Sequence, residues 1–352
     1  MAPKILLHGS GAIGTIYLYL LQTTGYDITA VCRSNHSAVA TDGFHIDSDK
    51  YGHGLHFRPK IARSPAEAAE ANPDGFDFVI VTTKALPETR TSEVIRPAVT
   101  EGRTCIVLIQ NGIAIEEEYA AAFAENPILS CVVYLPTTQV APGRIEMKNF
   151  ELLEVGTFPA AAYTDAGKPQ VRASADAFME MMRGAGSNVK WFDDIQEKRW
   201  NKLLLNAPWN PMCALALSRD VALLAATPEA EKVVEDVMLE VVAVSKALGY
   251  DAISPQAAKD QLERATERIG GKGIEPSMLV DVLWSRRMEA EAILGNPVKV
   301  ARRLGLSVPR LEMLYVLTKA LDEAIALRQP GQSLAGDETK VALEQKKQGS
   351  SL

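Results

Sequence analysis

The sequence is poor in three features that would assign a protein class at once: paired cysteines, long apolar runs and excess positive charge. Its four cysteines have neither disulfide-framework nor zinc-site spacing. No apolar run approaches the roughly 20 residues that span a bilayer. The net charge of −7 argues against a nucleic-acid partner, because phosphate binding requires a basic face. We therefore expect a cytoplasmic, globular protein with reduced thiols that contacts neither membrane nor nucleic acid.

The first half of the chain alternates short β-branched runs with helical stretches. Such alternation predicts parallel strands joined by right-handed crossovers, hence an α/β fold with a Rossmann-type doubly wound sheet over residues 1–193. A later β-rich section with a hairpin near Ala141–Arg144 is expected to extend this sheet. The expected strands are Ile5–His8, Ile28–Cys32, Phe78–Thr82, Thr104–Ile109 and those within Leu129–Val155.

Long helical runs dominate from residue 194 onward. They predict an all-helical C-terminal domain over residues 194–330, followed by a polar, disordered tail over 331–352. The expected helices are Gln196–Asn206, Pro228–Leu248, Pro255–Arg268, Pro276–Leu294 and Leu311–Arg328.

A glycine-rich turn follows the first expected strand and opens a helix. Gly9, Gly11 and Gly14 fit the G-x-G-x-x-G pattern in the context that dinucleotide binding requires. The free N–H groups of the helix N-terminus then face the pyrophosphate. The alternative is a glycine turn without a ligand. The residues predicted to bind the cofactor here are Gly9, Ser10, Gly11, Ala12, Ile13 and Gly14.

Arg33 directly follows the second expected strand, at the place where enzymes that use NAD have a carboxylate for the ribose hydroxyls. A guanidinium suits the 2′-phosphate of NADP instead, because it donates charge-assisted hydrogen bonds in a planar fork. A solvated surface arginine is the alternative. The sequence thus favours NADP(H) as the cofactor.

Three further segments place polar side chains beside apolar ones. Lys84 and Asn111 each come just past the carboxyl end of an expected strand, where open α/β sheets bind ligands. A solvated lysine and an ordinary Asn-Gly turn explain them equally well. Lys202, Asn206 and Asn210 recur every four residues among leucines and tryptophans, so they share one slowly rotating face of a helix with a local break at Pro208. Burying such groups is costly unless they have hydrogen-bond partners. The alternative is an amphipathic helix with one polar, solvent-exposed face.

A similar polar stripe runs through the expected helix Pro276–Leu294. Ser277, Asp281, Ser285 and Glu289 fall at four-residue steps among apolar residues. By itself this pattern is typical of a solvated helix face.

Taken together, these motifs resemble the ketopantoate reductase (2-dehydropantoate 2-reductase) family, particularly its fungal-type members. The resemblance runs from Gly9 to about Leu321. Its most specific part is Lys202-Leu-Leu-Leu-Asn206-Ala-Pro-Trp-Asn210-Pro211, with Pro276-Ser277 and Glu289 at the matching spacing. It implies a Rossmann domain and a helical domain with a cleft between them for NADPH and a 2-keto acid, and a homodimer is compatible with it.

The resemblance also implies roles for the polar residues. Lys202 is the general acid, Asn206 and Asn210 orient the substrate, and Ser277 binds its carboxylate. Glu289 lies by the lysine and the ribose of the cofactor, Arg33 meets the 2′-phosphate, and Lys84 and Asn111 lie near the nicotinamide, Asn111 also near the substrate. Two positions depart from the bacterial pattern: Ile274 and Asp220 stand where the bacterial enzymes have asparagines. Both leave open which acid is the substrate, 2-dehydropantoate or an acid such as 2-ketoisovalerate.

The expected chemistry is hydride transfer to a keto carbon with a protonated lysine supplying the proton, and it needs no metal. His36, His45, His53 and His56 fall in a polar, Gly- and Asp-rich region and are expected on the surface. Two other functions stay open. A β-hydroxyacid dehydrogenase would have glycines immediately before the lysine, where this chain has Arg199-Trp200-Asn201. An NADP-binding regulator without turnover would use the same cofactor turn.

Overall fold

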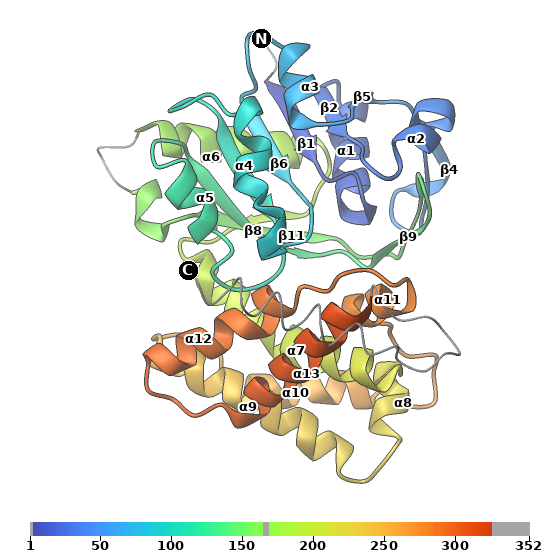
Figure 1. Cartoon of the computed structure of the whole chain (residues 1–352), viewed down its shortest axis with the longest axis vertical. Coiled ribbons are helices and arrows are strands. Elements are labelled where there is room, and N and C mark those ends of the chain that lie inside the picture. The colour runs from blue at the N-terminus through green and yellow to red at the C-terminus, as the bar shows by residue number, and fades with distance from the viewer. Residues whose placement is uncertain (1–2, 165–168, 326–352) are drawn as a thin grey trace. The chain divides into compact units, whose positions relative to one another are not determined.

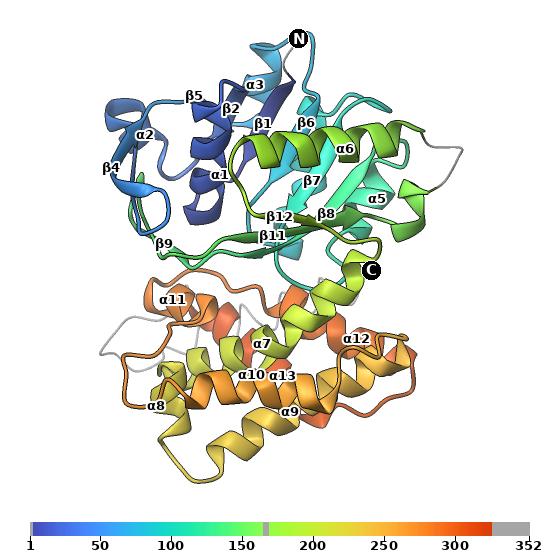
Figure 2. The same ribbon diagram turned by 180° about the vertical axis from the view of Figure 1, so that it is seen from behind.

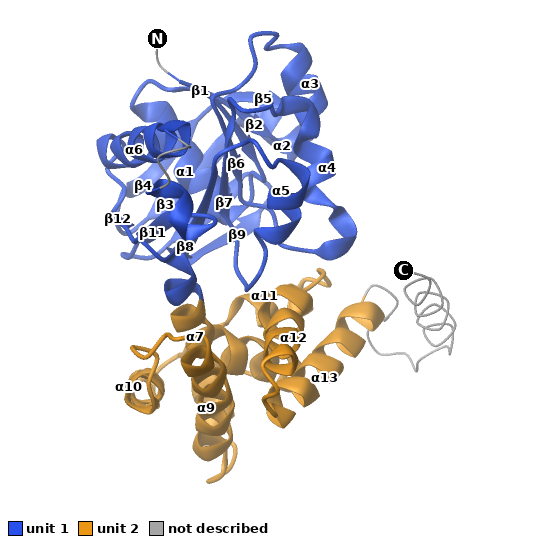
Figure 3. Cartoon of the chain, turned by 90° about the vertical axis from the view of Figure 1, so that its left-hand side faces the viewer, with its two compact units in different colours: residues 1–199 blue, residues 200–352 orange. Residues whose placement is uncertain are grey.

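The computed structural model describes residues 3–164 and 169–325. The chain divides into two compact units, Met1–Arg199 and Trp200–Leu352 (Figure 3). The division falls inside helix α7 (Ile195–Ala216), which begins two residues after the domain boundary expected at residue 193. The tail expected over residues 331–352 lies outside the described residues.

A mixed sheet of eight strands forms the centre of the first unit, within the described residues. Six neighbouring strands, in the spatial order β5-β2-β1-β6-β7-β8, run parallel to one another. Strand β11 is antiparallel to β8, and β12 pairs parallel with β11. This arrangement confirms the predicted doubly wound α/β fold. In order across the sheet the strands are β12 (Val189–Trp191), β11 (Leu152–Thr157), β8 (Ile128–Tyr134), β7 (Cys105–Ile109), β6 (Phe78–Val81), β1 (Lys4–His8), β2 (Asp27–Val31) and β5 (Lys60–Ala62).

Helices cover both faces of this sheet. α4 and α5 lie on the side that faces the viewer in Figure 1, whereas α6 lies on the side that faces the viewer in Figure 2. Strands β1, β6 and β7 are almost wholly buried, because they are covered on both faces. The helical segments of this unit are α1 (Ala12–Thr23), α2 (His36–Asp42), α3 (Pro65–Glu70), α4 (Thr91–Ile95), α5 (Glu117–Ala122) and α6 (Pro169–Gly184), with short 3₁₀ turns at Pro87–Thr89, Arg96–Ala98 and Ala160–Tyr163.

A second, four-stranded sheet was not expected from the sequence. Of the β-rich section Leu129–Val155, strands β8 and β11 extend the large sheet as expected. Strands β9 (Thr137–Ala141) and β10 (Arg144–Met147) form the predicted hairpin but do not join that sheet. Instead β10 pairs with β3 (Phe44–Ser48), which in turn pairs with β4 (Gly52–Phe57). Helix α1 packs against β9 and β10, so this sheet encloses part of the same core.

The second unit is helical throughout the residues that the structure describes. Helix α9 packs against α10, α12 and α13. No described helix has the length and apolarity that a membrane span requires. Its helices after α7 are α8 (Asp220–Leu224), α9 (Ala230–Ala247), α10 (Pro255–Thr266), α11 (Ser277–Leu283), the π-helical turn η4 (Glu291–Gly295), α12 (Asn296–Arg303) and α13 (Pro309–Ile325).

Two helix predictions were wrong in detail. Helix α7 continues through Pro208 to Ala216, so the break expected at that proline does not end the helix. The expected helix Pro276–Leu294 does break, after Leu283, because Ser285 adopts a left-handed conformation with φ of 50°. Ser277 and Glu289 therefore do not share one helical stripe.

Candidate active site

The register of the large sheet aligns the carboxyl ends of its central strands. His8 of β1 pairs with Val31 of β2 on one side and with Val81 of β6 on the other. Val81 in turn pairs with Leu108 of β7. The segments that follow these strands carry the glycine turn, Arg33, Lys84 and Asn111. The sheet thus brings four predicted site segments to one edge.

The glycine turn requires glycine at its first and last positions. Gly9 has a φ of +114°, and a Cβ there would lie 2.6 Å from the backbone nitrogen of Thr83. A Cβ on Gly14 would lie 2.1 Å from the carbonyl oxygen of Gly9. Gly11, at the N-cap of α1, gives that helix no side-chain cap, and the first turn carries no acidic residue. The N–H groups and positive dipole end of α1 are therefore suited to a phosphate.

Ser10 and Asn35 join the glycine turn to the end of β2. The buried Ser10 hydroxyl donates to the carbonyl oxygen of Val31 at 2.7 Å. The Asn35 side-chain amide donates to the carbonyl oxygen of Ser10 at 2.8 Å. The Ser10 hydroxyl, within a predicted cofactor turn, is thus engaged within the protein. These contacts hold the turn beside the segment that carries Arg33.

Arg33 is exposed two residues after the end of β2. Burial, and secondly the positive charge of Arg33, lower the pKa of His8 from 6.5 to about 4. His8 directly precedes Gly9, so the positive charge of Arg33 acts on the residue next to the glycine turn. This edge of the sheet is therefore favourable to an anion.

The loops that carry Lys84 and Asn111 are joined by Gln110. Its side-chain amide donates to the carbonyl oxygen of Thr83 at 2.8 Å, and its oxygen accepts from the Tyr119 hydroxyl at 3.2 Å. Lys84 and Asn111 are both half-buried. The two predicted residues thus stand on adjoining loops.

A buried ion pair holds the Asn111 loop, and the sequence did not reveal it. Arg199 and Glu116 are 3% and 0% exposed, and their charged groups are 2.6 Å apart. Arg199 also donates to the carbonyl oxygens of Gln110 and Gly112, at 2.9 and 3.0 Å, on either side of Asn111. The signal available in the sequence was Glu116, which directly follows the apolar segment Ile113-Ala114-Ile115. Arg199 lies on α7 three residues before Lys202.

In the second unit, two predicted substrate residues meet. Asn210, 3% exposed on α7, accepts a hydrogen bond at Oδ1 from the Ser277 hydroxyl at 3.2 Å. The same oxygen accepts from the backbone N–H of Met278 at 3.4 Å. Lys202 and Asn206 are half-buried on the same helix. Residues that are 67 positions apart are thereby joined at the start of α11.

Glu289 is buried just before the π-helical turn η4, and helix α13 anchors the segment that carries it. Asp322 on α13 accepts from the Arg287 guanidinium at 2.7 Å and from the backbone N–H of Met288 at 2.6 Å. Tyr315 of the same helix donates to Glu291 at 2.6 Å. The sequence missed Asp322, which lies 33 residues from Glu289.

The two positions that depart from the bacterial pattern are in contact with each other. The backbone N–H of Ile274 donates to the buried carboxylate of Asp220 at 2.6 Å. Ile274 itself is half exposed and lies three residues before Ser277. Asp220 and Ile274, the two positions that differ from the bacterial pattern, thus form one contact just before the start of α11.

Comparisons with known proteins agree over nearly the whole described chain. Residues 5–160 match the family described as "Ketopantoate reductase PanE/ApbA", and residues 194–322 match its C-terminal counterpart. An uncharacterised protein of Saccharomyces cerevisiae is 31% identical over 338 residues, which cover 89% of this chain and 92% of the yeast protein. This yeast relative agrees with the fungal-type resemblance.

Named reductases are also similar. A 2-dehydropantoate 2-reductase of Nostoc sp. is 27% identical over 319 residues, covering 91% of this chain and 95% of the relative. The crystal structure of 2-dehydropantoate 2-reductase from Geobacter metallireducens GS-15 is 30% identical, covers 90% of this chain and 99% of its own, and has a TM-score of 0.78. The chain belongs to the ketopantoate reductase family of oxidoreductases, as its motifs predicted.

Proposed function

We propose that this protein uses NADPH to reduce the keto group of a small branched 2-keto acid, with reduction of 2-dehydropantoate to pantoate as the first reaction to test. The contact between Asn210 and Ser277 supports this most directly. A hydroxyl beside an amide suits a carboxylate next to a keto oxygen, because both substrate groups accept hydrogen bonds. Since Asn210 Oδ1 already accepts from Ser277 and Met278, its Nδ2 group is the one suited to donate to substrate.

The chain's own residues account for the remaining chemistry. NADPH, when bound, supplies the hydride that adds to the keto carbon. Negative charge then develops on the former keto oxygen, which Lys202 Nζ stabilises and protonates. Asn206 and Asn210 orient the acid without titrating. When the acid binds, the Ser277 hydroxyl turns from Asn210 and donates to the carboxylate, while Asn210 Oδ1 still accepts from the backbone N–H of Met278. Glu289 holds the lysine and the ribose in place, which its burial and its anchoring by α13 support.

The residues at the sheet edge fit the cofactor. A backbone surface that a Cβ at Gly9 or Gly14 would obstruct suits the close approach of a pyrophosphate. Exposed Arg33, beside a buried neutral histidine, suits the 2′-phosphate that distinguishes NADPH from NADH. Lys84 and Asn111, on loops joined through Gln110, then serve the nicotinamide side.

A panel assay tests this function. The purified protein is mixed with NADPH and a series of 2-keto acids that includes 2-dehydropantoate and 2-ketoisovalerate, and NADPH oxidation is followed by absorbance. We expect turnover with branched acids. NADPH binding by calorimetry without oxidation of any acid would instead support a regulator without turnover. Oxidation of 3-hydroxy acids with NADP, without reduction of 2-keto acids, would support a β-hydroxyacid dehydrogenase.

The assembly and compartment complete the proposal. We propose a cytoplasmic homodimer. The four cysteines are unpaired and buried, which suits a reducing compartment. Met313, Val316 and Leu317 are exposed on α13 at helical spacing, an apolar stripe that suits a subunit contact. Light scattering on the protein as it elutes from a size-exclusion column tests the dimer. A mass near that of one 38.2 kDa chain would contradict it.

A further inference from the structure

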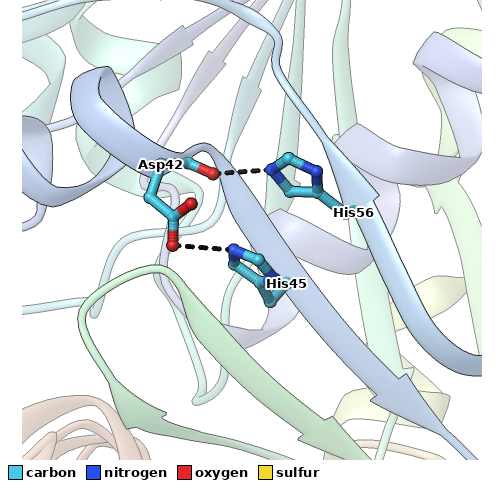
Figure 4. Close-up of side chains that lie close together, drawn as sticks. All are labelled: Asp42, His45 and His56. Atoms are coloured by element: carbon cyan, nitrogen blue, oxygen red, sulfur yellow. Dashed lines mark hydrogen bonds and ion pairs between the residues drawn. The ribbon is translucent and has the colours of Figure 1, made fainter.

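Two histidines and an aspartate converge on the four-stranded sheet, outside the candidate active site. His45 and His56 are direct partners in the antiparallel pairing of β3 and β4. Their rings stack with centroids 4.5 Å apart and planes 18° from parallel. Asp42 is the last residue of α2. Figure 4 shows both imidazoles presenting a nitrogen to this aspartate.

The contacts in this cluster are short. His45 Nε2 lies 2.9 Å from Asp42 Oδ2, and His56 Nε2 lies 2.6 Å from the carbonyl oxygen of Asp42. One ligand atom from each of the three residues lies within 4.8 Å of the other two. Ligand atoms about 2.1 Å from a tetrahedral metal stand about 3.4 Å apart. The two imidazoles must rotate out of their stacked arrangement to bring all three ligand atoms onto one ion.

We propose that Asp42, His45 and His56 form a surface site for one divalent transition-metal ion of the Zn²⁺ or Ni²⁺ class. Imidazole nitrogen suits these ions, whereas Mg²⁺ and Ca²⁺ prefer oxygen ligands. The Asp42 side chain is about half exposed and supplies an anionic oxygen ligand beside the two imidazoles. Three protein ligands leave a further position for water.

The bound ion would join three elements: the end of α2 and the paired strands β3 and β4. Because this arrangement exists only in the folded chain, metal binding stabilises the fold by mass action. The site takes no part in the proposed reduction, so the expectation that the chemistry needs no metal is unaffected. Its role is to hold α2, which begins three residues after Arg33, against the small sheet.

Two arginines oppose the ion. Arg144 lies 3.2 Å from Asp42 Oδ2, and both side chains are about half exposed. Arg58 donates to the neighbouring carbonyl oxygen of Thr41 at 2.9 Å. An exposed ion pair of this kind contributes little to stability, so a metal can displace Arg144 from the carboxylate. Replacing Arg144 should therefore tighten metal binding.

Calorimetry on the full chain without an affinity tag tests the site. We expect one equivalent of Zn²⁺ to bind and to raise the melting temperature, with no binding of Mg²⁺. His45→Asn and His56→Asn should each weaken Zn²⁺ binding by roughly tenfold or more, because even residues that only orient a metal ligand contribute 10–100-fold. Arg144→Gln should strengthen it.

His53→Asn is the matched control. His53 is 71% exposed on the same strand as His56 and lies 3.9 and 4.0 Å from Asp47 and Asp49. Zn²⁺ affinity should not change in this variant. Circular dichroism checks that each variant is folded. Absence of Zn²⁺ binding by the wild type, equal affinity in the folded His45 and His56 variants, or loss of binding in the His53 variant would each overturn the proposal.

Discussion

The carboxylate of Asp220 holds the main chain at Ile274, three residues before the predicted substrate residue Ser277. Asp220 Oδ1 accepts from the N–H of Ile274 at 2.6 Å, and Oδ2 accepts from Arg268 at 2.6 Å. The Asp220 side chain is buried, so the contact is sheltered from competition by water. This contact links the start of α8 to the entrance of α11.

Asp220→Ala should loosen the segment in front of Ser277. The variant leaves the partly buried N–H of Ile274 and the Arg268 guanidinium without their partner, so urea unfolding should show a loss of about 1–3 kcal/mol. The KM for the keto acid should rise more than kcat falls, and NADPH affinity should stay constant. Asp220→Asn is the control, because its side-chain oxygen still accepts from Ile274. An unchanged KM in a folded Asp220→Ala protein would show that the contact does not position Ser277.

Arg33→Ala should weaken NADPH selectively. The variant loses a charge-assisted contact to phosphate, worth about 1.5–3 kcal/mol, which corresponds to roughly a tenfold to hundredfold rise in the NADPH KM. The KM for NADH should barely change. Arg303→Ala, which replaces an exposed arginine on α12, is the control. Equal losses with both cofactors would refute the phosphate contact.

Lys202→Ala should remove most turnover and leave cofactor affinity near that of the wild type. General acid catalysis contributes about 10²–10⁴-fold, so kcat should fall by that factor. Lys198→Ala is matched to it, since Lys198 lies one turn earlier on α7 and pairs with Glu197 at 3.1 Å. Single-turnover assays and NADPH titrations separate the two effects. A folded Lys202 variant with more than about a tenth of wild-type kcat would exclude Lys202 as the acid.

Because the apolar Ile274 stands where the bacterial enzymes have an asparagine, we expect weak discrimination between 2-dehydropantoate and 2-ketoisovalerate, which differ by a hydroxyl. A site that hydrogen-bonds a hydroxyl rejects an analogue without it by up to about 10⁴-fold, whereas an apolar site discriminates weakly. The kcat/KM values for the two acids should therefore agree within about 100-fold. A preference for 2-dehydropantoate above about 10³ would mean that another residue reads the hydroxyl.

His8 should make the protein sensitive to acid. Its folded pKa of about 4 lies below the unfolded value of 6.5, because burial and the charge of Arg33 disfavour the imidazolium. The unfolded chain therefore binds the proton first, and stability is lost as pH falls from 6.5 toward 4. Between pH 7.5 and 5 this linkage costs about 2 kcal/mol. Over the same pH interval, the free energy of unfolding of His8→Gln, measured in urea, should fall by about 2 kcal/mol less than that of the wild type. Equal losses in both proteins would contradict this prediction.

Local physics explains what the sequence determined by itself. Gly9, Gly11 and Gly14 belong to one turn, and Lys202, Asn206 and Asn210 follow the period of a single helix. Backbone sterics and a repeat of 3.6 residues act over a few positions, so such features are visible in a short stretch of chain. The family, the doubly wound sheet and the helical second half rest on patterns of this local kind.

Only the tertiary structure decided how distant segments meet. The four-stranded sheet, the contact of Asp220 with Ile274 and the stacking of His45 on His56 join residues whose pairing no local pattern encodes. The expected helix Pro276–Leu294 illustrates the same limit, because its periodicity is helical throughout. There the carboxylate of Asp322, which lies on α13 and is 35 and 34 positions away in the sequence, binds Arg287 and the backbone of Met288. Long-range hydrogen bonds to buried charges outweigh weak local helix propensities, and they exist only once the chain has folded.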